Sequence, residues 1–314
     1  MTASRLTRGY LIAFAATLIW SSSGVFIRYL SLQYQLPALV LAFWRDLIIA
    51  IALALGLVLF RRSLLRSGYG NGYFFAFYGL VLALFNSLWT LSVTLNGAAA
   101  ATVMAYSSAA FTAILGWWLL HEALGWGKLG VVTLSMFGCI LVAGAFTPEA
   151  WQLNPLGILT GLISGLMFAA YSLMGRSASL RGIPPLTSLV YTFAWASFFL
   201  LAFNLAADIA GGVPPFSRLL WLQNNVPAWL ILLALALGPT LGGFGLYTLS
   251  LVDLPASIAN LISTLEPIFT ALIAYVVLAE LLTPVQLLGG ALILCSVVLL
   301  RILEARRPPA VDIK

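Results

Sequence analysis

The sequence predicts an all-α integral membrane protein whose ten transmembrane helices form two inverted five-helix repeats around a central cavity. Three observations lead to this prediction: the scarcity of charge, the spacing of the charged residues and an internal repeat. The 314 residues are 62% hydrophobic and 8% charged, and their mean hydropathy is +1.06. Soluble domains carry roughly 25% charged residues. Because this chain has too little charge to cover a water-facing surface, it is expected to lie in a lipid bilayer.

The gaps between charged residues set the predicted spans, since a spanning helix needs about 20 apolar residues. The stretch 67–120 contains no charged residue and has room for two spans. The N-terminal stretch resembles a signal peptide, but its apolar run continues past Trp20 to Ile27, so we expect it to form the first span. The ten predicted helices lie near residues 10–30, 37–60, 72–94, 98–119, 127–146, 155–176, 186–207, 228–250, 256–279 and 284–303.

The Lys and Arg residues predict the orientation of the chain, because they concentrate on the cytoplasmic side of membranes. With the N-terminus placed in the cytoplasm, twelve of the 15 Lys and Arg residues fall on that side. Only Arg28 and Arg218 fall outside, and Arg45 lies within a span. We therefore expect a multi-pass protein of the cytoplasmic (inner) membrane of a bacterium, with both termini in the cytoplasm. The basic balance is explained by topology and anionic lipid headgroups, not by nucleic-acid binding.

The chain is internally repeated. The stretch 98–122 aligns without gaps on 256–280 and pairs Glu122 with Glu280, and the first two predicted helices of each half match as well. The halves differ mainly in a longer Gly- and Pro-rich connection at 207–228. Because five is an odd number of helices, the halves are expected to cross the membrane in opposite senses, as in many secondary carriers. We expect a first repeat at 1–146, a linker at 147–154, a second repeat at 155–303 and a cytoplasmic tail at 304–314.

The segment "EPIFTALIAYVVLAELLTPVQLLGGALI" (266–293) resembles the EamA branch of the drug/metabolite transporter superfamily. Arg45 and the weaker first-half counterpart through His121-Glu122 extend the resemblance over nearly the whole chain. It implies a ten-helix carrier in which helices 1–4 and 6–9 surround a central cavity while helices 5 and 10 lie outside. Within the family, the chain is similar to YddG-type exporters of aromatic amino acids. Ser108-Ala109 replaces Glu-Pro in the first half, so no paired carboxylates are implied.

Glu266 is an isolated carboxylate within an apolar run. A charge at the centre of a membrane helix is costly and normally faces protein or water. Pro267 has no N–H, so the carbonyl of Ser263 loses its helical partner and a bend is expected. Two interpretations stay open. Either the carboxylate and the free carbonyl receive a substrate ammonium, or Glu266 is protonated or paired and only fixes the packing.

Polar and aromatic side chains on the central helices predict the wall of the cavity. Asn260 and Ser263 precede Glu266 on one predicted helix, and Tyr106 lies on its counterpart in the first half. A wall of aromatic rings suits apolar and aromatic substrates and permits cation–π contact with an amino group. Hydrogen bonds between helices and aromatic belts at the membrane interface are the alternative explanations. The predicted cavity residues are Trp20, Ser21, Tyr78, Asn86, Trp89, Tyr106, Tyr171, Tyr247, Asn260, Ser263 and Glu266.

Arg45 and Asp46 form a charged pair of neighbours inside the second predicted helix. Adjacent helical residues point about 100° apart, so the two side chains are not expected to pair simply with each other. Arg45 could meet a substrate carboxylate. A structural role, in which it snorkels or bonds backbone carbonyls, is the favoured interpretation.

Glycines and prolines mark close contacts or hinges. Gly157, Gly161 and Gly165 form a ridge that lets another helix approach. The stretch "LGPTLGGFG" (237–245) interrupts the eighth helix, either as a kinked packing surface or as a hinge for a moving gate. The predicted hinge residues are Gly238, Pro239, Gly242, Gly243 and Pro267.

No motif in the sequence favours an enzyme. The one histidine, His121, lacks the second histidine of a zinc motif, and the stretch before Lys128 lacks the first glycine of a Walker loop. No metal or cofactor is therefore expected, and gradients of substrate, protons or ions are expected to drive transport. A channel would not need two halves that rock against each other.

The predicted function is secondary-active export of amino acids, aromatic and other neutral ones, by alternating access. A broad metabolite or drug exporter of the same superfamily is the first alternative. A nucleotide-sugar-type exchanger is the second, and it should need several cavity cations where only Arg45 lies deep in a span. The predicted partners are small-molecule amino acids and the lipid bilayer, without nucleic acid, and a monomer is expected to suffice for transport.

Overall fold

The computed structural model describes residues 3–66, 70–122, 124–142, 154–278 and 283–305, and within these residues every regular element is a helix. Six helical segments are long and apolar enough to cross a membrane, namely Arg5–Gln33, Ala38–Phe60, Gly72–Leu95, Pro155–Leu180, Pro185–Ala210 and Val226–Asp253. Shorter apolar helices lie at Ser108–Leu120, Trp126–Leu141 and Leu287–Leu300. The predicted all-helical membrane protein is confirmed, whereas the count of ten spans stays a prediction.

The first half of the chain contains α1 (Ala3–Trp20), α2 (Ser23–Gln33), α3 (Ala38–Phe60), α4 (Arg62–Arg66), α5 (Gly72–Ala105), α6 (Ser108–Leu120) and α7 (Trp126–Val142). The second half contains α8 (Pro155–Leu180), α9 (Pro185–Ala210), the 3-10 turn η2 (Arg218–Leu220), α10 (Val226–Leu235), the π-helical turn η3 (Ala236–Thr240), α11 (Leu241–Asp253), α12 (Ala256–Ser263), α13 (Glu266–Leu278) and α14 (Pro284–Ala305). Most of the predicted linker and tail lie outside the described residues.

Several predicted helices are interrupted. The first predicted span breaks at Ser21 and Ser22, whose hydroxyl groups donate to backbone carbonyls of the preceding turn. The eighth predicted span passes through η3, which contains Pro239. Proline removes the hydrogen bond to the carbonyl four residues earlier, and the hydroxyl of Thr240 donates to that carbonyl of Leu235 at 2.8 Å. The structure thus satisfies the polar group that the proline would otherwise leave free.

One predicted boundary is wrong. The sequence predicts separate helices at 72–94 and 98–119, whereas α5 continues through Gly97 to Ala105. The interruption comes later, at Tyr106 and Ser107, and α6 begins at Ser108. A glycine disfavours a helix by only about 1 kcal/mol, so tertiary packing can carry the helix past it.

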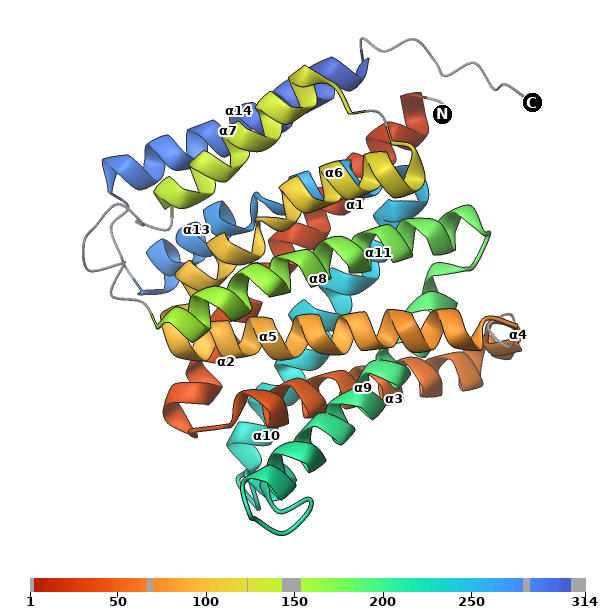
Figure 1. Ribbon diagram of the computed structural model, residues 1–314, viewed down its shortest axis with the longest axis vertical. Helices are drawn as coiled ribbons and strands as arrows, with labels where there is room; N and C mark the ends of the chain where they lie inside the picture. Colours follow the sequence, from red (N-terminus) through yellow and green to blue (C-terminus); the bar gives the residue numbers. More distant parts are fainter. Residues whose placement is uncertain (1–2, 67–69, 123, 143–153, 279–282, 306–314) are drawn as a thin grey trace.

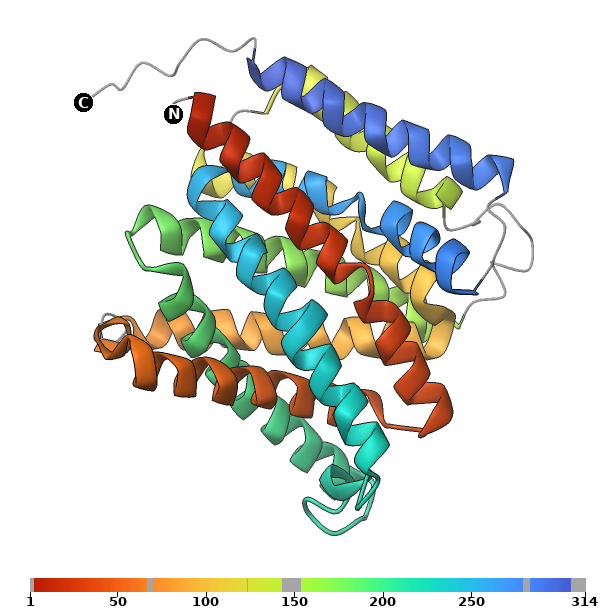
Figure 2. The same cartoon turned by 180° about the vertical axis from the view of Figure 1, so that it is seen from behind.

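Helices of the first repeat pack mainly against helices of the second. The pairs α5 with α8, α3 with α9 and α1 with α11 each join the two halves. Figure 2 shows α1 (red) running alongside α11 (cyan). Among the described helices, α7 and α14 pack mainly on each other, along one edge of the bundle (Figure 1). This is the arrangement that the resemblance implies for the fifth and tenth helices.

The glycine ridge on α8 brings this helix into close contact with α5. The hydroxyl of Ser92 donates to the carbonyl of Gly157 at 2.8 Å. A Cβ added at Gly161 would lie 2.8 Å from the Cβ of Met104, and one added at Gly165 would lie 2.9 Å from the carbonyl of Ala105. The predicted packing role of the ridge is therefore confirmed, and it fixes the position of α8 beside the cavity.

Candidate functional site

A cavity lies between the two repeats, where α1, α3, α5, α8 and α11 meet. About 520 Å³ of space there is free of atoms, a figure that includes the part open to the surroundings. Its wall is formed by Trp20, Ser23, Arg45, Phe85, Asn86, Trp89, Thr102, Ala105, Tyr106, Phe168, Thr240, Phe244, Ser263 and Glu266. Because both repeats contribute, their relative movement would change the shape of the cavity.

Many of the residues in the wall lie where a helix is interrupted. Trp20 ends α1, Tyr106 follows the end of α5, and Thr240 ends η3. Ser263 ends α12, and Glu266 begins α13. Helix ends leave backbone N–H and C=O groups without intrahelical partners, and in membranes such irregular backbone is tolerated where it lines a cavity. The breaks therefore bring polar groups to a site that apolar helices enclose.

Glu266 meets Tyr106 across the boundary between the repeats. The phenolic hydroxyl of Tyr106 donates a hydrogen bond to Oε2 of Glu266. Tyr106 is buried, whereas Glu266 keeps partial exposure in the cavity wall. Pro267 lies in the first turn of α13, where its missing N–H is not needed. The bend expected at this proline is thus a full break between α12 and α13, and Glu266 stands at the start of the new helix.

Arg45 and Asp46 are both buried in α3. The Nε of Arg45 lies 3.5 Å from Oδ1 of Asp46, and Asn86 donates from Nδ2 to the other carboxylate oxygen at 2.7 Å. The expectation that the two neighbours do not pair is wrong, because the long arginine side chain turns back toward Asp46. Among the described residues, Arg45 bonds no backbone carbonyl, so the favoured structural interpretation has no contact to support it.

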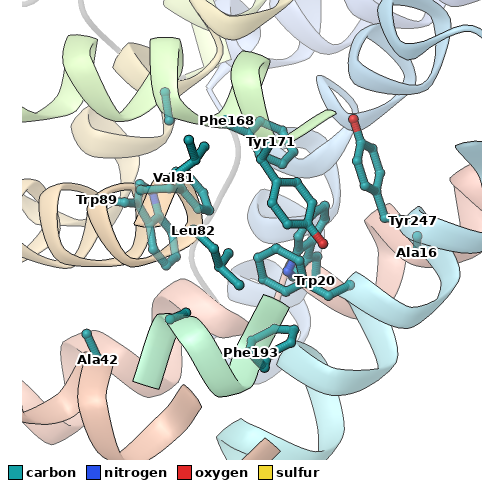
Figure 3. Packing of buried hydrophobic residues seen from close by; sticks show 14 of the residues in the cluster. Ala16, Trp20, Ala42, Val81, Leu82, Trp89, Phe168, Tyr171, Phe193 and Tyr247 are labelled. Carbon is teal, nitrogen blue, oxygen red and sulfur yellow. The ribbon is translucent and has the colours of Figure 1, made fainter. Parts of the chain in front are cut away.

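Aromatic rings form the apolar part of the wall. The ring centroids of Trp20 and Phe244 are 4.7 Å apart, and those of Phe85 and Phe168 are 5.1 Å apart and stacked. Figure 3 shows Trp20, Phe168 and Tyr247 converging from α1, α8 and α11. Edge-to-face and offset contacts of this kind hold the rings in place. A ligand here would meet fixed flat surfaces.

Six of the predicted cavity residues lie in the wall: Trp20, Asn86, Trp89, Tyr106, Ser263 and Glu266. The other five, Ser21, Tyr78, Tyr171, Tyr247 and Asn260, are buried but are not among the lining residues. Ser21 donates to its own helix, at the carbonyl of Leu18. The wall also contains Phe85, Phe168 and Phe244, which are absent from the predicted set because phenylalanine carries no polar group to mark it.

A hydrogen-bonded network lies behind the aromatic wall. The hydroxyls of Tyr247 and Ser172 are 2.6 Å apart, and Asn260 donates to Ser172 at 3.3 Å. Asn260 in turn accepts from Ser108 at 2.9 Å, which links the two repeats. Part of the predicted polar stripe therefore serves contacts between helices, as the alternative explanation proposed.

The predicted hinge glycines have different surroundings. A Cβ added at Gly243 would lie 2.8 Å from the Trp20 ring, so this glycine lets the indole approach α11. One added at Gly242 would lie 3.3 Å from Ile19. Gly238 has open space around it. Of these three glycines, Gly238 is therefore the one at which an added Cβ would meet no neighbouring atom within 4 Å.

A second polar cluster joins the repeats outside the cavity wall. Glu122, after α6, accepts hydrogen bonds from the backbone amides of Ala256 and Ser257 at 2.8 Å and 3.3 Å, and from the Ser257 hydroxyl. Lys128 also donates to that hydroxyl and lies 3.8 Å from Glu122. Asp253, three residues before Ala256, forms an ion pair with Arg8 of α1, whose Nε lies 3.6 Å from its Oδ2. These contacts hold α1, α6 and α7 to the junction of α11 and α12.

Comparisons with known proteins agree with this architecture. The sequence profile of the EamA-like transporter family matches residues 7–144 and 155–302. An uncharacterised transporter of Synechocystis sp. is 25% identical over 71% of this chain, and the chain spans 64% of that relative's length. An uncharacterised transporter of Archaeoglobus fulgidus is 24% identical over 93% of this chain and 97% of its own length. A solved crystal structure shares the fold with a TM-score of 0.74 at 19% identity, covering 96% of this chain and 98% of its own.

Proposed function

Because the chain belongs to the EamA-like transporter family, which indicates a membrane transporter, we propose that it exports amino acids, aromatic and other neutral ones, by secondary-active alternating access. The relatives are named as transporters without a substrate, so the proposal rests on the cavity itself. The question is which small molecule its wall would accept.

The observation that carries the proposal is the position of Glu266. It is the one carboxylate among the lining residues, and the Tyr106 hydroxyl donates to one of its oxygens. A carboxylate with an oxygen to spare, at the start of a helix in a largely apolar site, can accept hydrogen bonds from an ammonium group. The rings of Trp20 and Phe168 supply a surface for an apolar or aromatic side chain and for cation–π contact.

Alternating access would follow from the two repeats. The Glu122 cluster and the network around Asn260 both join the halves. Neither Glu122 nor Asn260 lines the cavity, although Ser263, about one turn after Asn260, does. We propose that these contacts close one end of the bundle in this conformation. With both termini in the cytoplasm of a bacterial inner membrane, as the charge distribution predicts, the closed end would be the cytoplasmic one.

A second candidate is export of organic cations, within the broad drug or metabolite class. One carboxylate and an aromatic wall are also what a lipophilic cation would need, so this observation favours both candidates. Nucleotide-sugar exchange finds less support, because Arg45 is the one cation among the lining residues.

Counterflow in proteoliposomes tests the proposal. Vesicles loaded with unlabelled L-phenylalanine should accumulate labelled L-phenylalanine from outside, and L-leucine inside should support the same exchange. Transient accumulation is expected of a carrier and not of an open pore. Accumulation of a labelled lipophilic amine without any amino acid counterflow would favour the second candidate. Absence of counterflow with every amino acid tried would overturn the first.

A further inference from the structure

Arg45 has hydrogen-bonding capacity that the protein does not use. Its side chain is 2% exposed, and it contributes to the cavity wall. An arginine has five N–H donors, yet among the described residues the only hydrogen bond of Arg45 runs from Nε to Asp46 at 3.5 Å. Its Nη2 is buried without any partner among those residues. A buried charge normally has its polar atoms satisfied, so this nitrogen, on a residue of the cavity wall, is a candidate contact for a ligand.

Arg176 shows how this chain satisfies an arginine that only supports structure. It lies in α8, and its Nη1 donates to the carbonyls of Leu251 and Val252 at 2.8 Å and 3.1 Å. Those carbonyls lie near the C-terminal end of α11, where a cation is favourable. Arg45 has no comparable backbone contact among the described residues. Arg176 therefore forms its hydrogen bonds within the protein, whereas Arg45 has N–H donors left over that a ligand could bind.

The surroundings of Arg45 hold it in place without neutralising its whole donor set. Asp46 is fully buried and is itself fixed by the 2.7 Å hydrogen bond from Asn86, which also lies in the cavity wall. This carboxylate contacts Nε of the guanidinium, and no described residue forms a hydrogen bond with a terminal nitrogen. A planar guanidinium with two free nitrogens matches a carboxylate, which it can bind through parallel hydrogen bonds.

We propose that Arg45 binds the carboxylate of the substrate while Glu266 receives its ammonium, so that the cavity selects zwitterions over amines. Asp46 and Asn86 are positioning residues that orient the guanidinium. The inference rests on the proposed function, because it names the part of an amino acid that Arg45 and Glu266 each recognise. It also separates the two candidates, since an organic cation would have no use for Arg45.

The test compares substrates that differ only in the carboxylate. In the counterflow assay, L-phenylalanine should compete with labelled L-phenylalanine at least tenfold better than phenethylamine does, because a hydrogen-bonded charged pair is worth tenfold or more in affinity. Arg45→Gln alone would leave Asp46 as an unpaired buried charge. The variant to use is therefore R45Q/D46N, which removes both charges and keeps an acceptor for Asn86. R176Q, which removes a buried arginine outside the cavity wall and leaves Arg45 and Asp46 in place, is the matched control.

In R45Q/D46N the preference for L-phenylalanine over phenethylamine should fall at least tenfold, while R176Q keeps it. A merely structural role would lower folded yield or turnover without changing this ratio, and an unchanged ratio in the folded double variant would overturn the proposal. If wild-type protein shows no amino acid counterflow, the proposed function fails, and Arg45 is judged by thermal stabilisation with 3-phenylpropionate. Stabilisation lost in R45Q/D46N and kept in R176Q would uphold a carboxylate site. Equal or absent stabilisation in all three proteins would overturn it.

Discussion

The carboxylate of Glu122 in the first repeat accepts a hydrogen bond at 2.8 Å from the backbone amide of Ala256, the first residue of α12 in the second repeat. The first amides of a helix have no partner within the helix, and a negative charge at this end is favourable. Pro255 precedes the helix, so α12 begins immediately after a proline that separates it from α11. A side chain of one repeat thus completes a helix of the other, and under the proposed alternating access this contact would have to break for the bundle to open here.

Replacing Glu122 with alanine should loosen this closure. Loss of a helix-capping acceptor costs on the order of 1 kcal/mol, which corresponds to about a fivefold shift between two conformations. A cysteine placed at the buried Ser250, in a variant without Cys139 and Cys295, should therefore react about fivefold faster with a water-soluble maleimide added from the side of the membrane on which the N-terminus lies. Replacement of the exposed Arg62 by alanine is the control and should leave the rate unchanged. An unaltered rate in the Glu122 variant would mean that this contact does not hold the end closed.

Gly161→Leu should destabilise the packing of α8 on α5. Even its Cβ would lie 2.8 Å from both the Met104 Cβ and the Ser92 hydroxyl, and overpacking of this kind costs about 1–3 kcal/mol. Thermal unfolding followed by fluorescence-detected size exclusion should show a lower midpoint and less monodisperse protein. Gly130→Leu is the matched control, because nothing lies within 4 Å of the added Cβ there. Equal stability of the two variants would contradict the ridge as a packing surface.

Local signals in the sequence predict helix starts better than helix ends. The start of α8 at Pro155 follows Asn154, whose side chain accepts from the Leu156 amide at 2.9 Å, and both residues are recognisable in the sequence. The continuation of α5 past Gly97 has no such signal, since it depends on the surface that the rest of the fold offers to α5. The break before Glu266 is marked by Pro267, although proline alone does not distinguish a bend from two helices.

The cavity wall is predicted only in part, for a related reason. Tyr78 lies on α5 with Phe85 and Trp89, yet its ring contacts Tyr171 at a centroid distance of 4.9 Å and lies outside the wall. A polar aromatic residue satisfies the same sequence pattern whether it faces a ligand or a neighbouring helix. Arg45 shows the opposite error. The angle between adjacent Cα–Cβ bonds predicts that Arg45 and Asp46 point apart, but it does not restrict where a long, flexible side chain ends.

Gly238→Ala should slow transport without weakening substrate binding. Gly238 lies in the π-helical turn η3 beside Pro239, and a Cβ there meets nothing within 4 Å. Alanine therefore fits this conformation, and its effect should come from reduced backbone freedom when the turn changes shape. Turnover in counterflow should fall severalfold at an unchanged half-saturation concentration. Gly243→Ala is a contrasting variant, since its Cβ would press on Trp20 and should weaken binding as well. Unchanged turnover in Gly238→Ala would remove η3 from the moving parts.

Glu266 and Tyr106 allow the binding and packing interpretations to be separated by a pair of variants. Glu266→Gln removes the negative charge but still offers an oxygen to the Tyr106 hydroxyl, whereas Tyr106→Phe removes the hydrogen bond and keeps the carboxylate. If the carboxylate receives the substrate ammonium, Glu266→Gln should lower amino acid counterflow at least tenfold, because a charged hydrogen bond is lost from the complex. It should also flatten the dependence of counterflow on pH, since the titratable group is gone, while the folded yield stays near wild type. Tyr106→Phe should keep most of the activity.

The packing interpretation predicts the reverse pattern for the same two variants. If the Tyr106 hydrogen bond to Glu266 only joins the repeats, Tyr106→Phe breaks it and should lower the thermal midpoint, whereas Glu266→Gln preserves it and should be well tolerated. Size-exclusion profiles and thermal midpoints therefore have to accompany each counterflow measurement. A fully active Gln variant with wild-type pH dependence would exclude Glu266 from substrate binding. Recognition of an amino group would then fall to the rings of Trp20 and Phe168, which lie in the same wall with their ring centroids 5.6 Å apart.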